Sequence, residues 1–100
     1  MKVVWAPLAI ERAAEHAAYI AADRPEASRN WVIGLFDSTK SLAQFPRRGR
    51  RVPELDRPEY RELIYGHYRV VYRVDAHQVV VLTVRHGRPR LDMTEIVESE

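Results

Sequence analysis

Residues 60–85 read YRELIYGHYRVVYRVDAHQVVVLTVR, and this stretch decides the fold of the chain. It contains three runs rich in valine and tyrosine, at 60–65, 68–74 and 78–85, and both residue types favour strands. Short turns separate the runs. Strands joined by such short turns pair antiparallel. We therefore predict a three-stranded antiparallel sheet.

The middle run alternates with a period of two, which is typical of a strand with two different faces. Its tyrosines, with Val70 and Val74, share one face, whereas Arg69, Val71 and Arg73 share the other. The third run alternates little, which is typical of a strand covered on both faces. We expect the face with Arg69 and Arg73 to look outward.

The N-terminal half predicts one strand followed by two helices. Residues 2–5 form an apolar run too short for a helix, and Pro7 and Pro25 each suit a first helical turn. After each proline, apolar residues recur at steps of three and four. The first helix has an alanine-rich face, and Pro46 ends the second. The second helix carries the larger side chains that we expect in the core, including Trp31, Leu35, Phe36, Leu42 and Phe45.

These elements predict an α+β fold, with an N-terminal strand, a helical hairpin and then a three-stranded antiparallel sheet with both helices on one face. One hundred residues fit a single domain, 1–100. The acidic segment at about 91–100 is expected to be either a short helix or a disordered tail. Cysteine is absent and no apolar run is long enough for a membrane span, so we expect a cytoplasmic protein without a membrane partner.

Basic residues are concentrated in the second half. Residues 1–46 are balanced in charge, whereas residues 47–90 carry a net charge of +6 and residues 91–100 carry −4. All eleven basic residues between 47 and 90 are arginines, which favours planar, bidentate contacts. Such a surface can hold phosphates or an acidic protein.

The arginines form three groups of candidate binding residues. The first is an electrostatic loop that is either a solvated charge run or a clamp: Arg47, Arg48, Arg50 and Arg51. The second lies on the strands and either contacts a target or forms salt bridges with Glu62, Asp75 or the acidic tail: Arg61, Arg69 and Arg73. The third lies at the mouth of the last strand: Arg85, His86, Arg88 and Arg90. His86 is either a general acid or base or a polar strand end.

Motifs for cofactors and metals are absent from the sequence. It contains no phosphate-binding glycine loop, no nucleophile elbow and no paired cysteines. The four histidines are spread along the chain, with His67 and His77 in predicted turns. We expect neither a metal nor a cofactor.

Three ordered stretches carry a family resemblance. They are WAPLA from residue 5 on to Tyr19 and Ile20; LAQFPRRGR from 42 with VPEL from 52; and YREL from 60, YRVVYRV from 68 and VRHGR from 84. Together they resemble the ParE branch of the ParE/RelE toxins of bacterial type II toxin–antitoxin systems. The resemblance implies a helical hairpin on an antiparallel sheet. It also implies a cognate ParD-like antitoxin, which binds operator DNA and covers the toxin with an acidic, amphipathic C-terminal segment.

The resemblance leaves two activities open. RelE-like members cleave mRNA on the ribosome, and Arg69, His86 and Arg88 are the residues here that would serve such cleavage. ParE-like members are linked to inhibition of DNA gyrase. No tyrosine follows Tyr72 and no lysine follows Lys40, so the RelE-type set is incomplete. The sequence thus favours a gyrase inhibitor that catalyses no reaction of its own over a ribosome-dependent endoribonuclease. A third hypothesis is a non-toxic remnant that only binds its partner.

Overall fold

The computed structural model describes residues 1–87 of the chain. Strand β1 (Lys2–Trp5) leads into helices α1 (Pro7–Ala21) and α2 (Pro25–Lys40), which are followed by a short 3-10 helix, η1 (Ser41–Ala43). Four strands complete the fold: β2 (Arg50–Arg51), β3 (Tyr60–Tyr65), β4 (Tyr68–Val74) and β5 (Gln78–His86). The predicted α+β class is confirmed.

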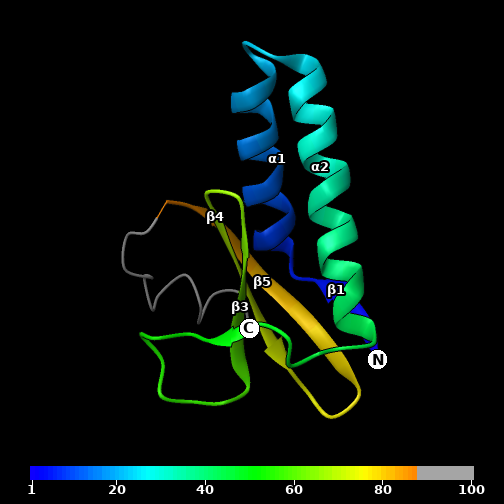
Figure 1. The fold of residues 1–100 in the computed structure, drawn as a ribbon, viewed down its shortest axis with the longest axis vertical. Coiled ribbons are helices and arrows are strands. Elements are labelled where there is room, and N and C mark those ends of the chain that lie inside the picture. Colours follow the sequence, from blue (N-terminus) through cyan, green and yellow to red (C-terminus); the bar gives the residue numbers. More distant parts are fainter. Residues whose placement is uncertain (88–100) are drawn as a thin grey trace.

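The strands form one five-stranded sheet in the order β1-β5-β4-β3-β2. The three strands predicted from residues 60–85 are its antiparallel centre. β1 adds to one edge by pairing parallel to β5, and β2 adds to the other edge by pairing antiparallel to β3. The helices form a hairpin on one face, and its free end projects beyond the sheet (Figure 1). The sheet is therefore wider than the three strands predicted, because the N-terminal strand β1 joins it and because the two-residue strand β2 lies within a segment that reads as a loop.

Local sequence explains where the helices begin and how they meet. Proline occupies the first turn of each helix, where its missing N–H has no intrahelical acceptor to lose. Ala9 of α1 is completely buried, and its small side chain allows close packing. The hydroxyl of Ser28 in α2 donates a hydrogen bond of 2.6 Å to the carbonyl oxygen of Ala17 in α1. This bond joins the two helices near their free end.

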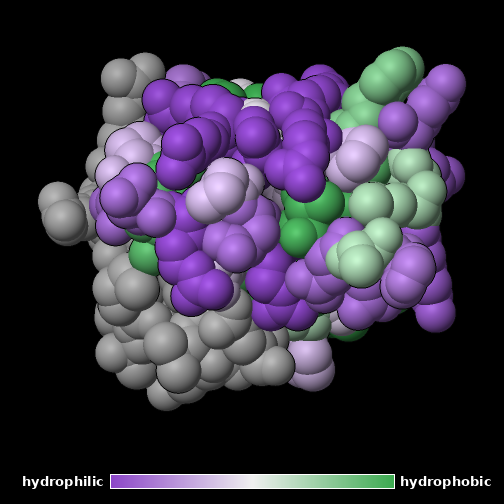
Figure 2. All heavy atoms as spheres, turned by 90° about the horizontal axis from the view of Figure 1, so that it is seen from below, coloured by the Kyte–Doolittle hydropathy of each residue, from purple (hydrophilic) through white to green (hydrophobic). Residues whose placement is uncertain are grey.

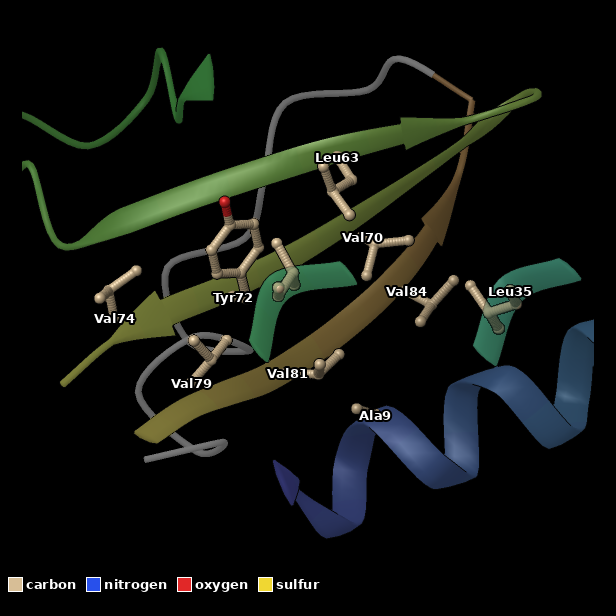
Figure 3. Packing of buried hydrophobic residues seen from close by; sticks show 10 residues of the cluster. Ala9, Leu35, Leu63, Val70, Tyr72, Val74, Val79, Val81 and Val84 are labelled. Carbon is tan, nitrogen blue, oxygen red and sulfur yellow. The ribbon is translucent and has the colours of Figure 1, made fainter. Parts of the chain in front are cut away.

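The main core lies between the helices and the sheet (Figure 3). Leu35 of α2 and Ala9 of α1 face the valines of the sheet there, and Leu35 is completely buried. Tyr72 of β4 is buried in the same cluster, and its hydroxyl accepts a hydrogen bond of 2.9 Å from the backbone N–H of Gly49. The core thus also holds the segment that precedes β2.

A second apolar cluster covers the opposite face of the sheet. The segment between β2 and β3 supplies Val52 and Leu55, which pack with Val71, Val80 and Leu82. The prediction that both faces of the last strand are covered is confirmed. The prediction that the face with Arg69 and Arg73 looks outward is wrong for Arg69, which is only 5% exposed because residues 52–59 cross this face.

Two aromatic side chains expected in the core are exposed. Phe36 is 44% and Phe45 58% exposed. The buried face of α2 continues from Leu35 to Thr39 and then Leu42 in η1, at steps of four and three residues, and Phe36 lies about 100° away from it. Phe36 instead lies against the ring of Trp5 of β1, with 5.0 Å between the ring centroids.

Membrane-spanning helices do not occur within residues 1–87, where every helix is too short or too polar to cross a bilayer.

Candidate functional site

Four charged side chains form a network on the face of the sheet opposite the helices. Arg69 of β4 donates hydrogen bonds to Glu62 of β3, with 3.0 Å between Nε and Oε1, and to both carboxylate oxygens of Glu54 at 2.9 Å. Arg50 of β2 donates from Nε and Nη2 to Oε2 of Glu62, at 3.0 and 2.8 Å. The side chains of Glu62 and Arg69 are 0% and 7% exposed, whereas that of Arg50 is 60% exposed.

The strand register explains how the network assembles. Glu62 pairs with Arg50 on one side and with Val71 on the other, so Arg69 is its diagonal neighbour on the same face. Glu54 reaches Arg69 from the segment that crosses this face. The hydrogen bonds that Arg69 donates to Glu54 raise the pKa of Arg69 above its ordinary value, against the effect of burial, so Arg69 remains charged. Two guanidinium groups therefore face two carboxylates in a largely buried site.

A pocket of 580 Å³ opens beside this network. Its charged wall is formed by Arg50, Glu54 and Arg69, and its lining also includes His67 from the turn between β3 and β4 and Tyr68 at the start of β4. Because both carboxylates already bind Arg69, the more exposed guanidinium of Arg50 is the group that can best meet an anion at the mouth. The pocket is suited to binding a charged group more than to proton transfer.

Arg61 points toward the helix side and holds the chain ahead of β2. Its Nη1 donates to the carbonyl oxygens of Gly49 at 2.9 Å and of Arg47 at 3.4 Å. Gly49 is required at this approach, since a Cβ there would lie 2.5 Å from the hydroxyl of Tyr72 and 2.6 Å from the carbonyl oxygen of Glu62. In this structure Arg61 thus serves the backbone of its own chain.

Arg73 forms an ion pair with Asp75 at the end of β4. Its Nε lies 2.7 Å from Oδ1 and its Nη2 3.1 Å from Oδ2. These hydrogen bonds lower the pKa of Asp75. The salt bridge that the sequence offered as the alternative for Arg73 is therefore formed.

We expect Asp75→Asn to reduce the free energy of unfolding at pH 7 by about 1 kcal/mol or less, the usual contribution of an ion pair near the surface, here with side chains 21% and 33% exposed. The pKa of Asp75 is lower in the folded than in the unfolded protein, so its contribution is complete above the unfolded pKa of about 3.9. It is lost as the pH falls through the lower folded value. Urea titrations of both proteins should differ at pH 7 and converge at about pH 2. A difference that persists at the acidic pH would contradict this.

The sheet separates the residues proposed for RNA cleavage. Arg69 and Arg85 pair across β4 and β5 and share the face of the charged network. His86 is opposite Tyr68, whose ring contacts the helix residues His16 and Trp31, so His86 lies on the helix face. The structure thus brings Arg69 and Arg85 together and places His86 apart from them. Arg88 and Arg90, like the segment 91–100, lie outside the described residues.

The arginines at 47–51 are exposed at the end of the molecule away from the free end of the hairpin. Arg48 donates a hydrogen bond to the hydroxyl of Ser41, and Arg51 lies 3.5 Å from Asp56. The side chain of Arg47 forms no ion pair with any residue in the described part of the chain. Viewed from below, this end is mostly hydrophilic, with hydrophobic side chains gathered toward one side (Figure 2).

Sequence reasoning missed the two glutamates that organise the site. At the level of sequence, Glu62 is named only as one possible salt-bridge partner and Glu54 is not singled out. The sequence does contain a useful signal, because Glu62 is a carboxylate within an apolar strand. A carboxylate is rarely buried in a protein unless it is paired with a positive charge. Residues 1–87 contain no cluster of three or more histidine, cysteine, aspartate or glutamate side chains arranged to hold a metal ion.

The architecture is shared with solved toxin–antitoxin structures. A chain from the chromosomal ParDE system of P. aeruginosa superposes with a TM-score of 0.75 at 19% identity, over 88% of this chain and 97% of the other. A chain of the RelBE2 toxin–antitoxin complex from Mycobacterium tuberculosis gives a TM-score of 0.57 at 22% identity, over 85% and 88%. At these identities the likeness shows the fold alone. None of the curated protein sequences matches the chain.

The fold is therefore that of the ParE/RelE-like toxins. Residues 3–90 match the model of the family described as the ParE toxin of the type II toxin–antitoxin system parDE, and the chain belongs to that family.

Proposed function

We propose that this protein inhibits DNA gyrase as a protein ligand and that a cognate antitoxin neutralises it. Membership in the ParE family supports the toxin role, and gyrase is the target to which the ParE-like branch is linked. The two solved structures with this fold come from toxin–antitoxin systems, which supports an antitoxin partner. Operator DNA would be contacted through the antitoxin.

The ion pairs of Arg69 are the observation that favours an inhibitor over a nuclease. Its guanidinium binds two carboxylates and is almost completely buried, so a phosphate would have to displace Glu54 or Glu62 to reach it. His86, the residue that the sequence offers for proton transfer, lies on the opposite face of the sheet from Arg69. Both facts favour binding over RNA cleavage.

The exposed arginines support an acidic antitoxin segment. Arg47 and Arg48 lie on the exposed surface, and the side chain of Arg50 is 60% exposed beside the pocket. Charge complementarity with an acidic C-terminal segment would raise the rate of association and make it sensitive to salt. The arginines at 47–51 thus fit the role of attracting the partner.

A supercoiling assay tests the proposal. We expect the purified toxin to inhibit gyrase at micromolar excess and the purified antitoxin to relieve this inhibition. Primer extension on mRNA after induction is the second arm, with His86→Gln compared with His77→Gln, since both histidines are exposed. Ribosome-dependent cleavage that only His86→Gln abolishes would overturn the proposal in favour of a nuclease. Normal growth on expression without antitoxin would instead indicate a non-toxic binding remnant.

A further inference from the structure

Three arginine side chains lie close together on the helix side of the sheet, where the chain approaches β2. Arg61 of β3 is opposite Tyr72 of β4 in the strand register, and Gly49 donates its backbone N–H to the hydroxyl of Tyr72. Arg47 and Arg48 directly precede Gly49, and both are exposed. We call Arg47, Arg48 and Arg61 the arginine cluster.

The charges of the arginine cluster all act on the buried hydroxyl of Tyr72. Burial raises the pKa of Tyr72, whereas the hydrogen bond from Gly49 and three positive charges oppose this rise. The three charges are those of Arg61, Arg48 and Arg47. No carboxylate within residues 1–87 is among the groups that act on this hydroxyl. The three guanidinium groups therefore share one neighbourhood, which holds no acidic side chain of the described chain.

Carboxylates in the surrounding segments are paired with other cations. Glu62 binds Arg50 and Arg69 on the opposite face of the sheet. The remaining carboxylates between residues 37 and 62 form ion pairs elsewhere: Asp37 with Lys40, Glu54 with Arg69, Asp56 with Arg51 and Glu59 with Arg57. The arginine cluster thus has three positive charges and no ion pair with any residue of the part of the chain that the structure describes.

The hydrogen bonds of the arginine cluster go to neutral acceptors. Nη1 of Arg61 donates to the carbonyl oxygens of Gly49 and Arg47, and Nη1 of Arg48 donates to the hydroxyl of Ser41. The buried Nε of Arg61 has no acceptor among residues 1–87. Neutral acceptors satisfy single donors but leave the charges, which repel one another. An anion among the three guanidinium groups would supply a counter-charge and further acceptors.

The number of guanidinium groups favours a phosphate over a carboxylate as this anion. In the network on the other face of the sheet, two carboxylates balance two guanidinium groups. A single carboxylate would leave most of the charge of the arginine cluster unbalanced. A phosphate monoester carries about two charges and three strong acceptor oxygens, and successive phosphates of a nucleic acid add one charge each. Planar guanidinium groups bind such oxygens bidentately.

We propose that the arginine cluster is a phosphate-binding site, in which the guanidinium groups of Arg47, Arg48 and Arg61 hold the phosphate oxygens. Inorganic phosphate, a nucleotide and the backbone of a nucleic acid all present this group. The site is a property of the isolated domain, so it goes beyond gyrase inhibition and is unaffected if gyrase is not the target. Attraction of an acidic antitoxin segment acts at longer range and needs no carboxylate bound at this site.

An NMR titration of the toxin with inorganic phosphate at constant ionic strength tests the site. The signals of the Gly49 backbone N–H and the Arg61 Nε–H should shift and reach saturation. Arg47→Gln combined with Arg48→Gln should weaken this binding about tenfold or more, because two charged donors are lost. Phosphate that leaves both signals unchanged in the wild type would overturn the proposal.

The matched control is Arg51→Gln combined with Arg57→Gln. It removes the same charge from two exposed arginines nearby, each of which already pairs with a carboxylate. Phosphate binding should weaken by less than about twofold, because only screened, distant charges are lost. Urea unfolding should change little in either double variant, since all four side chains are exposed. Equal weakening of phosphate binding in both would overturn the proposal, because general electrostatic attraction would then explain it.

Acetate, a DNA duplex and AMP distinguish the possible ligands. Acetate that shifts the two signals as strongly as phosphate would overturn the proposal in favour of a carboxylate from a protein partner. A short duplex that binds more tightly than AMP would support the site with a nucleic-acid backbone as its source. Arg47→Gln combined with Arg48→Gln should then reduce the salt slope of duplex binding by about 2, at about 0.9 per phosphate. AMP that binds at least as tightly as the duplex would support the site with a small phosphorylated ligand.

Discussion

Glu62→Gln is expected to lower the free energy of unfolding by about 3–5 kcal/mol, as removal of one partner from a buried ion pair does. The side chain of Glu62 is completely buried and accepts hydrogen bonds from Arg69 and Arg50. The amide of glutamine keeps the volume but removes the charge that balances Arg69. Arg69 would then depend on Glu54 alone for its counter-charge, inside a site it cannot easily leave.

The matched control for this prediction is Glu59→Gln. Glu59 pairs with Arg57 at 3.2 Å, and the two side chains are 36% and 65% exposed. Such a pair contributes about 0–1 kcal/mol. Urea unfolding followed by the fluorescence of Trp5 and Trp31 measures both variants. Equal losses in the two variants would show that burial of the network carries no special cost.

Leu35→Ala is expected to destabilise the protein by about 2–5 kcal/mol, through lost apolar burial and the cavity left behind. Leu35 is completely buried and is the side chain of α2 that faces the valines of the sheet (Figure 3). Neighbouring alanines on α1 are too small to fill the space. Because domains of this size are stable by only about 5–15 kcal/mol, the variant should unfold at much lower urea concentration.

Ile33→Ala is the control for Leu35→Ala on the same helix. Ile33 is 54% exposed, so its truncation removes little buried surface and should cost less than about 1 kcal/mol. The same urea titration separates the two. A loss of similar size in both variants would contradict the conclusion that Leu35, and not Ile33, lies on the packed face of α2, because alanine itself favours the helix at both positions.

Much of the fold could be predicted because local patterns and tertiary packing agree. The alternation from Tyr68 to Val74 and the prolines at the helix starts each carry a direct physical signal. β2 could not be predicted, since two arginines have no periodicity and their pairing with β3 is accompanied by contacts between distant segments, such as the ion pair of Arg50 with Glu62. The exposure of Phe36 and Phe45 also depends on the width of the packed face, which a single helix does not reveal.

The candidate site was predicted less well than the fold. The sequence indicated which residue types matter, and Arg73 has the partner that was offered for it. It could not show that residues 52–59 cross the sheet and bury Arg69, because that depends on contacts between distant segments. The cluster of rings around Tyr68 could not be predicted for the same reason. Its rings come from α1, α2, β4 and β5, and no pattern within one element connects them.

The pairing of β1 with β5 joins the first strand of the chain to the last described one. α1 depends on β5 as well, since Nε2–H of His16 donates to the carbonyl oxygen of Val84 at 2.8 Å. During synthesis the helical hairpin leaves the ribosome long before residues 78–86 and has no complete sheet to pack against. Such distant pairings form late in folding. The helical hairpin therefore cannot complete its packing until β5 has been made, and the sheet is the last part of the described fold to close.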